Sequence, residues 1–416
     1  MAGRASLHNL GLSRGAALSL TPCSASAPAL HALRLFDPAA LRVALGAGSV
    51  ADVWRMLRGR TEAHRPAPLV ISPPPGPRPA QAPRRMLADY VEAHRDELKA
   101  AAQSSGAILF RGWGLDAVQD MDVAMSALQF RPTEFFGTAP RKRLPESDFF
   151  FSNVAFEGGA AQSSQSWLQR QLGIVGQSGP TAASGHLQLF NYHNELAYLS
   201  PEAHVAPFGV LACLQKPEAG GMTVLADCRR VLRALEQELG EDMPVAFQYT
   251  IARKPKAGDR APQLSSGGYE SFLLGEFELE GVPDQWTPLE ERVESLGLQL
   301  QENGADRQVV SPWISLRRHH AASGSDTFWL NGNHMAIGAM GGADGKLPFV
   351  LKFASGEVRS PTKREMVSIA TSYWRESCFF EWQLGDLLLF DNQLMAHNAT
   401  PAVGARRILP CFGDAF

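Results

Sequence analysis

The chain has 416 residues, of which 45% are hydrophobic and 19% charged, and its formal net charge is −3 at pH 7. These proportions are typical of a globular protein that can bury a large core. The charge provides no basic surface for nucleic acid, and no run of 18 or more apolar residues is present to form a transmembrane helix.

The first segment, residues 1–36, contains no Asp or Glu but three Arg and many Ala, Ser and Leu. This composition resembles an organellar transit peptide, and the alternative is a disordered or weakly helical start. The five cysteines are widely spread without Cys-x-x-Cys spacing, which indicates buried thiols in a reducing compartment. We therefore expect the protein in the cytoplasm or in an organelle lumen.

A helical and Pro-rich extension is predicted over residues 37–103. Residues 37–65 have helical spacing of apolar side chains, and residues 66–84 contain eight prolines, which favour a stiff linker or a strand entering the core. Leu87 to Ala102 follows as an amphipathic helix, and Ser104-Ser105-Gly106 ends it.

The remainder of the chain, residues 104–416, is predicted to be mainly β. Short apolar strands separated by Gly, Pro and Asp turns are expected especially at Phe208–Leu214, Thr327–Leu330 and Leu387–Phe390. A mainly β chain with a helical N-terminal part predicts a double-stranded β-helix, the jelly roll of cupin-like proteins. Such a fold leaves a mouth in which inward side chains can hold a metal away from bulk water.

A metal site is indicated by His193-Asn194-Glu195 and by His397. Side chains two apart on a strand point to the same face, so His193 and Glu195 can reach one ion, and the fold must supply the third ligand. Two imidazoles and one carboxylate form the facial triad of non-haem iron oxygenases. A His-x-Glu pair also occurs by chance, and a buried hydrogen-bonded histidine is the alternative.

Five further segments strengthen the metal hypothesis, and they are Gly106–Trp113, Asn191–Tyr198, Leu214–Asp227, Phe328–His334 and Trp382–Ile408. In content and order these segments resemble the TauD/TfdA family of Fe(II)/2-oxoglutarate dioxygenases, in its SyrP-like, clavaminate-synthase-like branch. Relative to that family, the chain carries insertions near residues 156–185 and 252–308, the second with a charged helix around Pro288–Leu296. Such insertions form either a lid over the substrate or disordered loops.

The resemblance implies that His193, Glu195 and His397 bind iron. It also implies that the carboxylate excludes halogenation, because related halogenases replace it with a small residue to admit chloride. Asn331 and His334 are candidates to face the substrate, with core packing as the alternative. Weaker roles are expected for the basic run that ends in His319-His320, as a solvated loop, and for Asp386 and Asp391-Asn392, as turn residues around the strand of His397.

The resemblance also implies a clamp for 2-oxoglutarate. The planar fork of an arginine pairs with a carboxylate through two charge-assisted hydrogen bonds. Arg406 and Arg407 are adjacent, so only one of them can point inward from a strand. The family's Arg-Arg-Ile pattern favours Arg407 and leaves Arg406 on a solvated face. Thr223 matches a position whose hydroxyl supports the same carboxylate, and an ordinary strand threonine is the alternative.

The predicted function is that of an Fe(II)/2-oxoglutarate-dependent dioxygenase, which uses O₂ and releases succinate and CO₂. The resemblance implies hydroxylation of an unactivated C–H bond in a small amino acid or related carboxylate, free or tethered to a carrier protein. Two alternatives remain open, a cupin-like binding or regulatory protein that has lost turnover and a metal enzyme that ignores 2-oxoglutarate.

Overall fold

The computed structural model describes the chain over residues 68–73, 83–133, 141–153, 192–199, 206–216, 219–220, 222–253, 293–294, 297–303, 306–330, 349–399, 402–403 and 406–416. Several predictions lie outside these residues. They concern the segments 1–36 and 37–65, the insertion at 156–185, most of that at 252–308, and the two residues Asn331 and His334.

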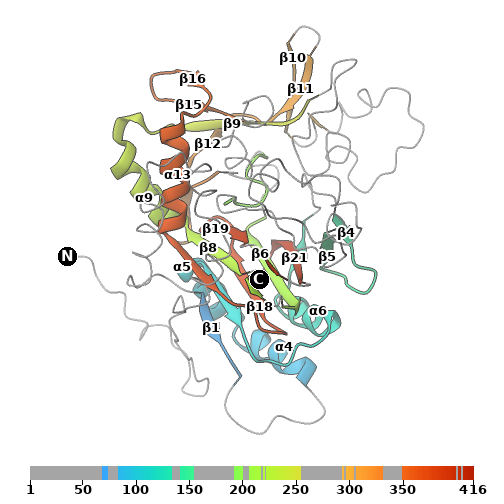
Figure 1. The fold of residues 1–416 in the computed structure, drawn as a ribbon. Coiled ribbons are helices and arrows are strands. Elements are labelled where there is room, and N and C mark those ends of the chain that lie inside the picture. The colour runs from blue at the N-terminus through green and yellow to red at the C-terminus, as the bar shows by residue number, and fades with distance from the viewer. Residues whose placement is uncertain are drawn as a thin grey trace, which may run out of the picture.

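A six-stranded sheet forms the centre of the molecule, with the strand order β1-β2-β18-β6-β21-β3 (Figure 1). Its strands are β1 (Leu69–Ile71), β2 (Ala107–Phe110), β3 (Arg131–Pro132), β6 (Phe208–Gln215), β18 (Leu387–Asp391) and β21 (Arg407–Asp414). β1 pairs with β2 in parallel, and the other pairs are antiparallel. The central strands are near-continuous apolar runs because both of their faces are buried. The strands predicted at Phe208–Leu214 and Leu387–Phe390 are thereby confirmed.

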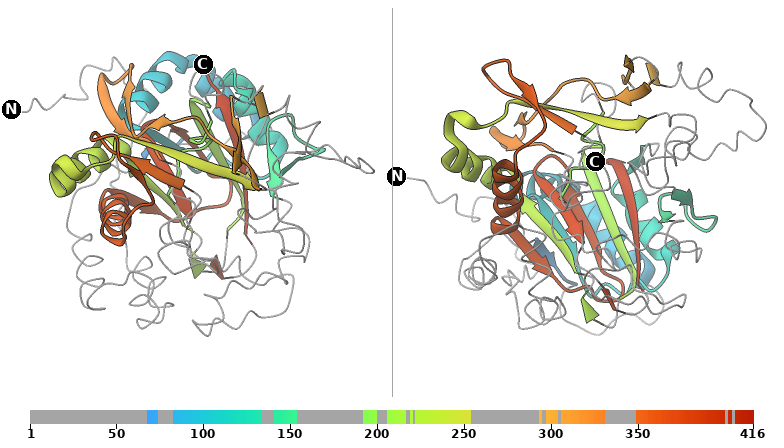
Figure 2. Two further views of the ribbon diagram at one scale, coloured as in Figure 1. Left: turned by 90° about the horizontal axis from the view of Figure 1, so that it is seen from above. Right: turned by 45° about the horizontal axis from the view of Figure 1, so that its top comes forward.

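Three helices cover the outer face of this sheet, and they are α4 (Pro83–Ala93), α5 (Arg95–Ser105) and α6 (Val118–Ala127) (Figure 2). Their apolar side chains pack with those of β2, β6 and β18 that point the same way. The single helix predicted from Leu87 to Ala102 is therefore wrong. The chain breaks at His94, whose φ of −125° and ψ of 25° are not helical, and restarts at Arg95. The predicted stop is confirmed, because Gly106 ends α5 with a φ of +87°.

Gly106 is also a point of close contact, because an added Cβ would lie 2.5 Å from Sδ of Met395. Gly106→Ala should lower the free energy of unfolding by about 1–3 kcal/mol, through this overlap and the left-handed backbone. Chemical denaturation measures the change. Gly356→Ala is a matched control, since Gly356 has a φ of +86° but no described atom within 4 Å of the added Cβ. Equal losses in both variants would show that the contact with Met395 contributes nothing.

A second, three-stranded sheet faces the inner side of the first. It has the order β17-β8-β19, from β17 (Ser377–Phe380), β8 (Thr223–Asp227) and β19 (Met395–Ala399). The ring of His397 on β19 lies 5.2 Å from that of Phe390 on β18 and 5.8 Å from that of Phe412 on β21. The space between the two sheets is therefore occupied by side chains from both. The helices α9 (Cys228–Leu239) and α13 (Lys363–Arg375) pack side by side next to this smaller sheet (Figure 1).

A third sheet lies beyond these two, organised around β9 (Ala246–Arg253). Its other strands are β10 (Gln299–Asn303), β11 (Asp306–Val310), β12 (Ile314–Ser315), β15 (Phe349–Lys352) and β16 (Val358–Arg359). Three two-stranded pairs complete the described strands, and they are β13 (Arg317–His320) with β14 (Ser325–Phe328), β4 (Arg141–Arg143) with β5 (Phe151–Asn153), and β7 (Ala219–Gly220) with β20 (Ala402–Val403). One short 3₁₀ turn, η3 (Gly240–Asp242), follows α9. The chain is thus mainly β with helices, as predicted.

Two local predictions need correction. The run ending in His319-His320 is not a solvated loop but strand β13, and His320 is only 5% exposed. The strand expected at Thr327–Leu330 is displaced toward the N-terminus, since β14 ends at Phe328. In both cases the hairpin between β13 and β14 sets the strand limits. Within the described chain, no helix combines the length and the apolar character needed to cross a membrane.

Candidate metal centre

The two histidines of the predicted triad are direct neighbours in the structure. His193 and His397 form an isolated antiparallel bridge, in which each backbone N–H donates to the other's carbonyl oxygen at 3.2 and 2.9 Å. Residues paired in this way place their side chains on the same face. Accordingly, the centroids of the two imidazole rings are 4.2 Å apart.

The third member, Glu195, lies in the turn that follows the bridge rather than on a strand. Its Oε2 is 3.6 Å from Nε2 of His193 and 3.7 Å from Nε2 of His397. One ligand atom from each of the three residues lies within 4.8 Å of the others. Glu195 and His397 are buried, at 5% and 9% exposure, and His193 is partly exposed. The sequence prediction that these three side chains converge is therefore confirmed.

This donor set fits a transition-metal ion. Nitrogen ligands lie about 2.1 Å from an ion such as zinc, so two donors of one ion can be up to about 4.2 Å apart. The carboxylate lies within that reach of both imidazoles, and a small movement of the histidines would complete the set. Two imidazoles and a carboxylate on one side of an ion leave its other positions open, which is the arrangement of Fe(II) oxygenases.

Aromatic rings surround the inner histidine. Phe390 and Phe412 reach His397 from the facing sheet, and Tyr192 next to His193 is 1% exposed. Gly209 makes this possible, because a side chain there would overlap the ring of Phe390. The apolar surroundings exclude water and strengthen electrostatic interactions at the triad.

The two adjacent arginines differ in their surroundings. Arg407 is a surface residue whose guanidinium lies 3.2 Å from Glu146, with 42% of its side chain exposed. On strand β21, Ile408 and Phe412 pack with the buried side chains that include Phe390, next to His397. Leu409 packs instead with the buried side chains of helices α4, α5 and α6. Arg406 directly precedes β21, and the pairing of β21 with β6 shifts register between Arg407 and Ile408.

Arg406 is poorly solvated at that position. Its Nε is buried and has no hydrogen-bond partner among the residues that the structure describes. Burial lowers the pKa of its guanidinium to about 10, and the nearby Cys213 thiol counteracts this. The group is thus still a cation at neutral pH. A buried guanidinium nitrogen without a hydrogen-bond partner is costly, so an anion that entered this space would stabilise it.

Thr223 lies on the same side of the smaller sheet as His397. Leu225 is paired directly with His397, and Thr223 is two residues away from it along β8. The threonine is 1% exposed, and its hydroxyl oxygen accepts a hydrogen bond of 3.1 Å from the indole N–H of Trp382. The hydroxyl therefore keeps its own hydrogen for donation. The contact with Trp382 was not predicted, because nothing in the sequence connects two positions so far apart.

The predicted turn residues have more specific contacts than the sequence indicated. Asp386 is fully buried and pairs with Arg111 at 2.7 Å. Asp391 accepts hydrogen bonds from the backbone N–H groups of Gln393 and Leu394, and its other oxygen lies 3.0 Å from Nε2 of the buried His320. The side-chain amide of Asn392 hydrogen-bonds to the backbone of Glu195 and of Ala206.

Comparisons with known proteins agree with this geometry. A model of the family described as "Taurine catabolism dioxygenase TauD, TfdA family" matches residues 73–258, which include His193, Glu195 and Thr223. A clavaminate synthase-like protein of Arabidopsis thaliana is 22% identical over 352 residues, covering 83% of this chain and 93% of the plant protein.

Solved structures give weaker likenesses. The PvcB protein of Pseudomonas aeruginosa is 13% identical, with a TM-score of 0.42 over 85% of this chain and 87% of its own. A taurine dioxygenase from Burkholderia xenovorans is 15% identical, with a TM-score of 0.37 over 78% of this chain and 81% of its own.

Proposed function

We propose that this chain hydroxylates an unactivated C–H bond of a small organic substrate. The ground is its resemblance to the TauD/TfdA dioxygenases, which the family match confirms. The predicted oxidoreductase class and the cofactors Fe(II), 2-oxoglutarate and O₂ are supported by the same match and by the convergent triad. The observation that carries the proposal is the convergence of His193, Glu195 and His397. The buried Nε of Arg406, which has no hydrogen-bond partner among the described residues, supports it.

The two facing sheets are proposed to be the halves of a double-stranded β-helix, with the metal ligands between them. In such a fold, β8 and β19 belong to the smaller sheet, and β6, β18 and β21 to the larger. Residues 104–416 would form the dioxygenase domain. The preceding segment contributes directly to it, because β1 pairs with β2 at the edge of the larger sheet.

The roles of the site residues follow from their chemistry. His193, Glu195 and His397 would hold the iron, and when bound, iron and 2-oxoglutarate supply the oxidising chemistry by which O₂ yields succinate, CO₂ and an oxidised substrate. Arg406 would pair with the distal carboxylate of 2-oxoglutarate, and this replaces the earlier assignment to Arg407, which is occupied at the surface by Glu146. Thr223 would donate its hydroxyl hydrogen to the same carboxylate.

The residues around the triad would exclude water and orient the bound groups. Phe390 and Phe412 keep the inner side of His397 dry. A desolvated Arg406 discriminates strongly for an anion with two coplanar oxygens, because its planar fork matches a carboxylate. Glu195 occupies the ligand position that a halide would need, so hydroxylation is proposed rather than halogenation.

The proposed substrate is a small amino acid or a related carboxylate, either free or tethered to a carrier protein. Asn331 and His334 remain candidates to face the substrate, and the segments 156–185 and 252–308 remain candidates for a lid.

Succinate formation by anaerobically iron-loaded protein tests the proposal. Turnover of 2-oxoglutarate in the presence of a panel of amino acids should exceed that without substrate for the correct class. Metal binding without succinate formation would favour a binding or regulatory protein. Substrate oxidation that does not require 2-oxoglutarate would favour the other alternative, a metal enzyme independent of it.

Changes at the carboxylate ligand should separate metal binding from hydroxylation. Glu195→Ala should abolish hydroxylation while keeping weak iron binding through the two histidines. Glu195→Asp should keep part of the activity, because the ligand chemistry is the same and only its reach differs. Iron stoichiometry and product formation are the measurements. Hydroxylation at the wild-type rate by Glu195→Ala would remove Glu195 from the metal site.

A further inference from the structure

The three metal ligands are not held in the same way. Main-chain hydrogen bonds between His193 and His397 fix the two histidines relative to each other. Glu195 lies beyond that bridge, in a turn, and Leu196 after it has a left-handed φ of +60°. A leucine in this conformation is strained, so the surrounding contacts must hold the turn in place.

Asn392 supplies such contacts from the turn between β18 and β19. Its side-chain oxygen accepts a hydrogen bond of 2.8 Å from the backbone N–H of Glu195. Its side-chain nitrogen donates to the carbonyl oxygen of Glu195 at 3.0 Å and to that of Ala206 at 3.0 Å. One amide thus engages both backbone polar groups of a single residue, and Asn392 is only 1% exposed.

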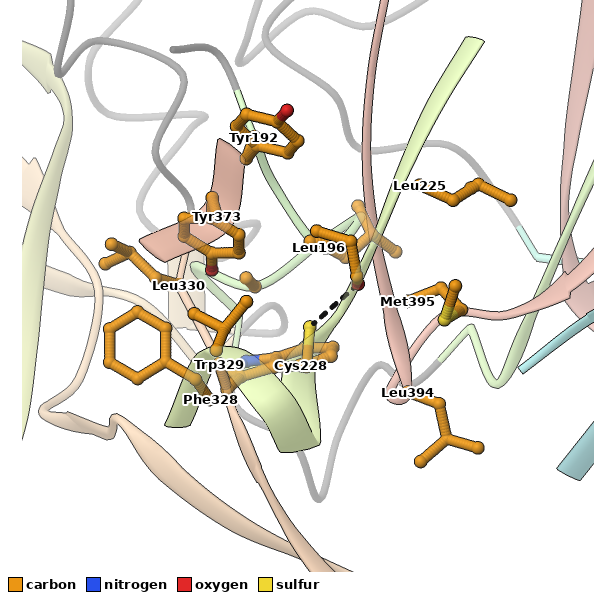
Figure 3. Close-up of a cluster of buried hydrophobic side chains, with 14 of the residues drawn as sticks. Tyr192, Leu196, Leu225, Cys228, Phe328, Trp329, Leu330, Tyr373, Leu394 and Met395 are labelled. Carbon is orange, nitrogen blue, oxygen red and sulfur yellow. Dashed lines mark hydrogen bonds between the residues drawn. The ribbon is translucent and has the colours of Figure 1, made fainter. Parts of the chain in front are cut away.

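The contact is reciprocal. The side-chain nitrogen of Asn194, the residue between the two ligands, donates to the backbone carbonyl oxygen of Asn392 at 2.7 Å. Asn194 is completely buried. Leu196 on the other side of Glu195 inserts into the cluster of buried side chains around Cys228 and Leu225 (Figure 3). The backbone of Glu195 is therefore held by hydrogen bonds at the residue itself and by burial on both sides.

The turn that carries Asn392 is itself anchored. Its neighbour Asp391 accepts hydrogen bonds from the backbone N–H groups of Gln393 and Leu394 and lies against His320 of β13. The backbone N–H of Asp391 donates to the carbonyl oxygen of Gly106 at 2.8 Å. Asn392 is thus presented from a rigid support, which a positioning residue requires.

We infer that Asn392 is the positioning residue for the carboxylate ligand: its side-chain amide, together with the return hydrogen bond from Asn194, fixes the turn that aims Glu195 at the metal. This inference rests on the proposed function, since it presupposes a metal at the triad. Partners that orient metal ligands in this way typically contribute about 10–100-fold to metal affinity.

Titration with Co(II) tests the inference, because its d–d absorption reports the arrangement of ligands as well as the affinity. Asn392→Ala should bind Co(II) about 10–100-fold more weakly, with an altered absorption spectrum. Asn392→Asp has the same shape and leaves no cavity. Its second carboxylate oxygen would face the carbonyl oxygens of Glu195 and Ala206, which accept hydrogen bonds but cannot donate them, so this variant should be impaired as well. The Co(II) affinity of Asn194→Ala should fall less than that of Asn392→Ala. In the double variant, the loss of binding free energy should be smaller than the sum of the two single losses.

Ser311→Ala provides the matched control. Ser311 is fully buried, accepts a hydrogen bond from the backbone N–H of Tyr249, and donates to the carbonyl oxygen of Pro312. Its loss should leave the Co(II) affinity and spectrum unchanged. Wild-type affinity and spectrum in both Asn392 variants, or an equal loss in Ser311→Ala, would overturn the inference and leave the proposed function intact. Equal Co(II) binding by wild-type protein and His397→Ala would instead refute the metal site itself.

Discussion

Replacing Arg406 with alanine should weaken 2-oxoglutarate binding by roughly thirty-fold to several-thousand-fold, which corresponds to a loss of about 2–5 kcal/mol. The physical reason is the burial of Arg406 Nε, which has no partner among the described residues and would gain one in the distal carboxylate. Arg406→Lys should be impaired too, because an ammonium cannot form two parallel hydrogen bonds. Calorimetric titration of metal-loaded protein with 2-oxoglutarate under anaerobic conditions measures the effect.

The neighbouring arginine is the control. Arg407→Ala removes only an exposed ion pair with Glu146, and the loss of such a pair typically costs about 0–1 kcal/mol. The 2-oxoglutarate affinity of this variant should therefore stay close to that of the wild type. The opposite order of effects would return the clamp to Arg407.

Replacing His193 or His397 with alanine should abolish stoichiometric iron binding and all turnover of 2-oxoglutarate. The fold should persist, because the bridge between these residues uses main-chain atoms that alanine also provides. Iron content after anaerobic loading and the far-ultraviolet circular dichroism spectrum are the two measurements. His319→Ala is a suitable control, since this exposed histidine pairs with Asp326 on a surface hairpin. Full iron content in either triad variant would exclude that histidine as a ligand.

The triad could be predicted from sequence because its chemistry restricts it. Few combinations of residues supply two imidazoles and a carboxylate, and the surrounding motifs identified which histidines to choose. Other features of the fold could also be predicted where one local signal dominated. Gly106 ends its helix, and the strand containing Leu387–Phe390 is a continuous apolar run.

The different burial of the two arginines could not be predicted from the sequence, for a definite physical reason. Ile408 and Leu409 on β21 are both apolar although they pack in different clusters of buried side chains. A strand of this kind has no alternation of polar and apolar residues that would reveal its inner side. Only the tertiary structure shows that Nε of Arg406 is buried and that Arg407 pairs with Glu146 at the surface.

The role of Asn392 was hidden for a different reason. Asp-Asn is a common turn signal, and the local sequence accounts for it without any distant contact. The hydrogen bonds to Glu195 join positions 197 residues apart in the chain. The break in the helix at His94 was similarly invisible, since the apolar spacing continues through it.

The bridge between His193 and His397 also bears on how the protein folds. Its partners are about two hundred residues apart, and contacts of such long range form slowly because closing the loop costs entropy before the contact compensates for it. The metal site can therefore be complete only after the two sheets have docked, late in folding. Because an ion held by this set would bind the native chain far better than the unfolded one, added metal should raise the midpoint of thermal unfolding in a concentration-dependent way. Bound iron would then contribute to the stability of the folded protein as well as to its chemistry.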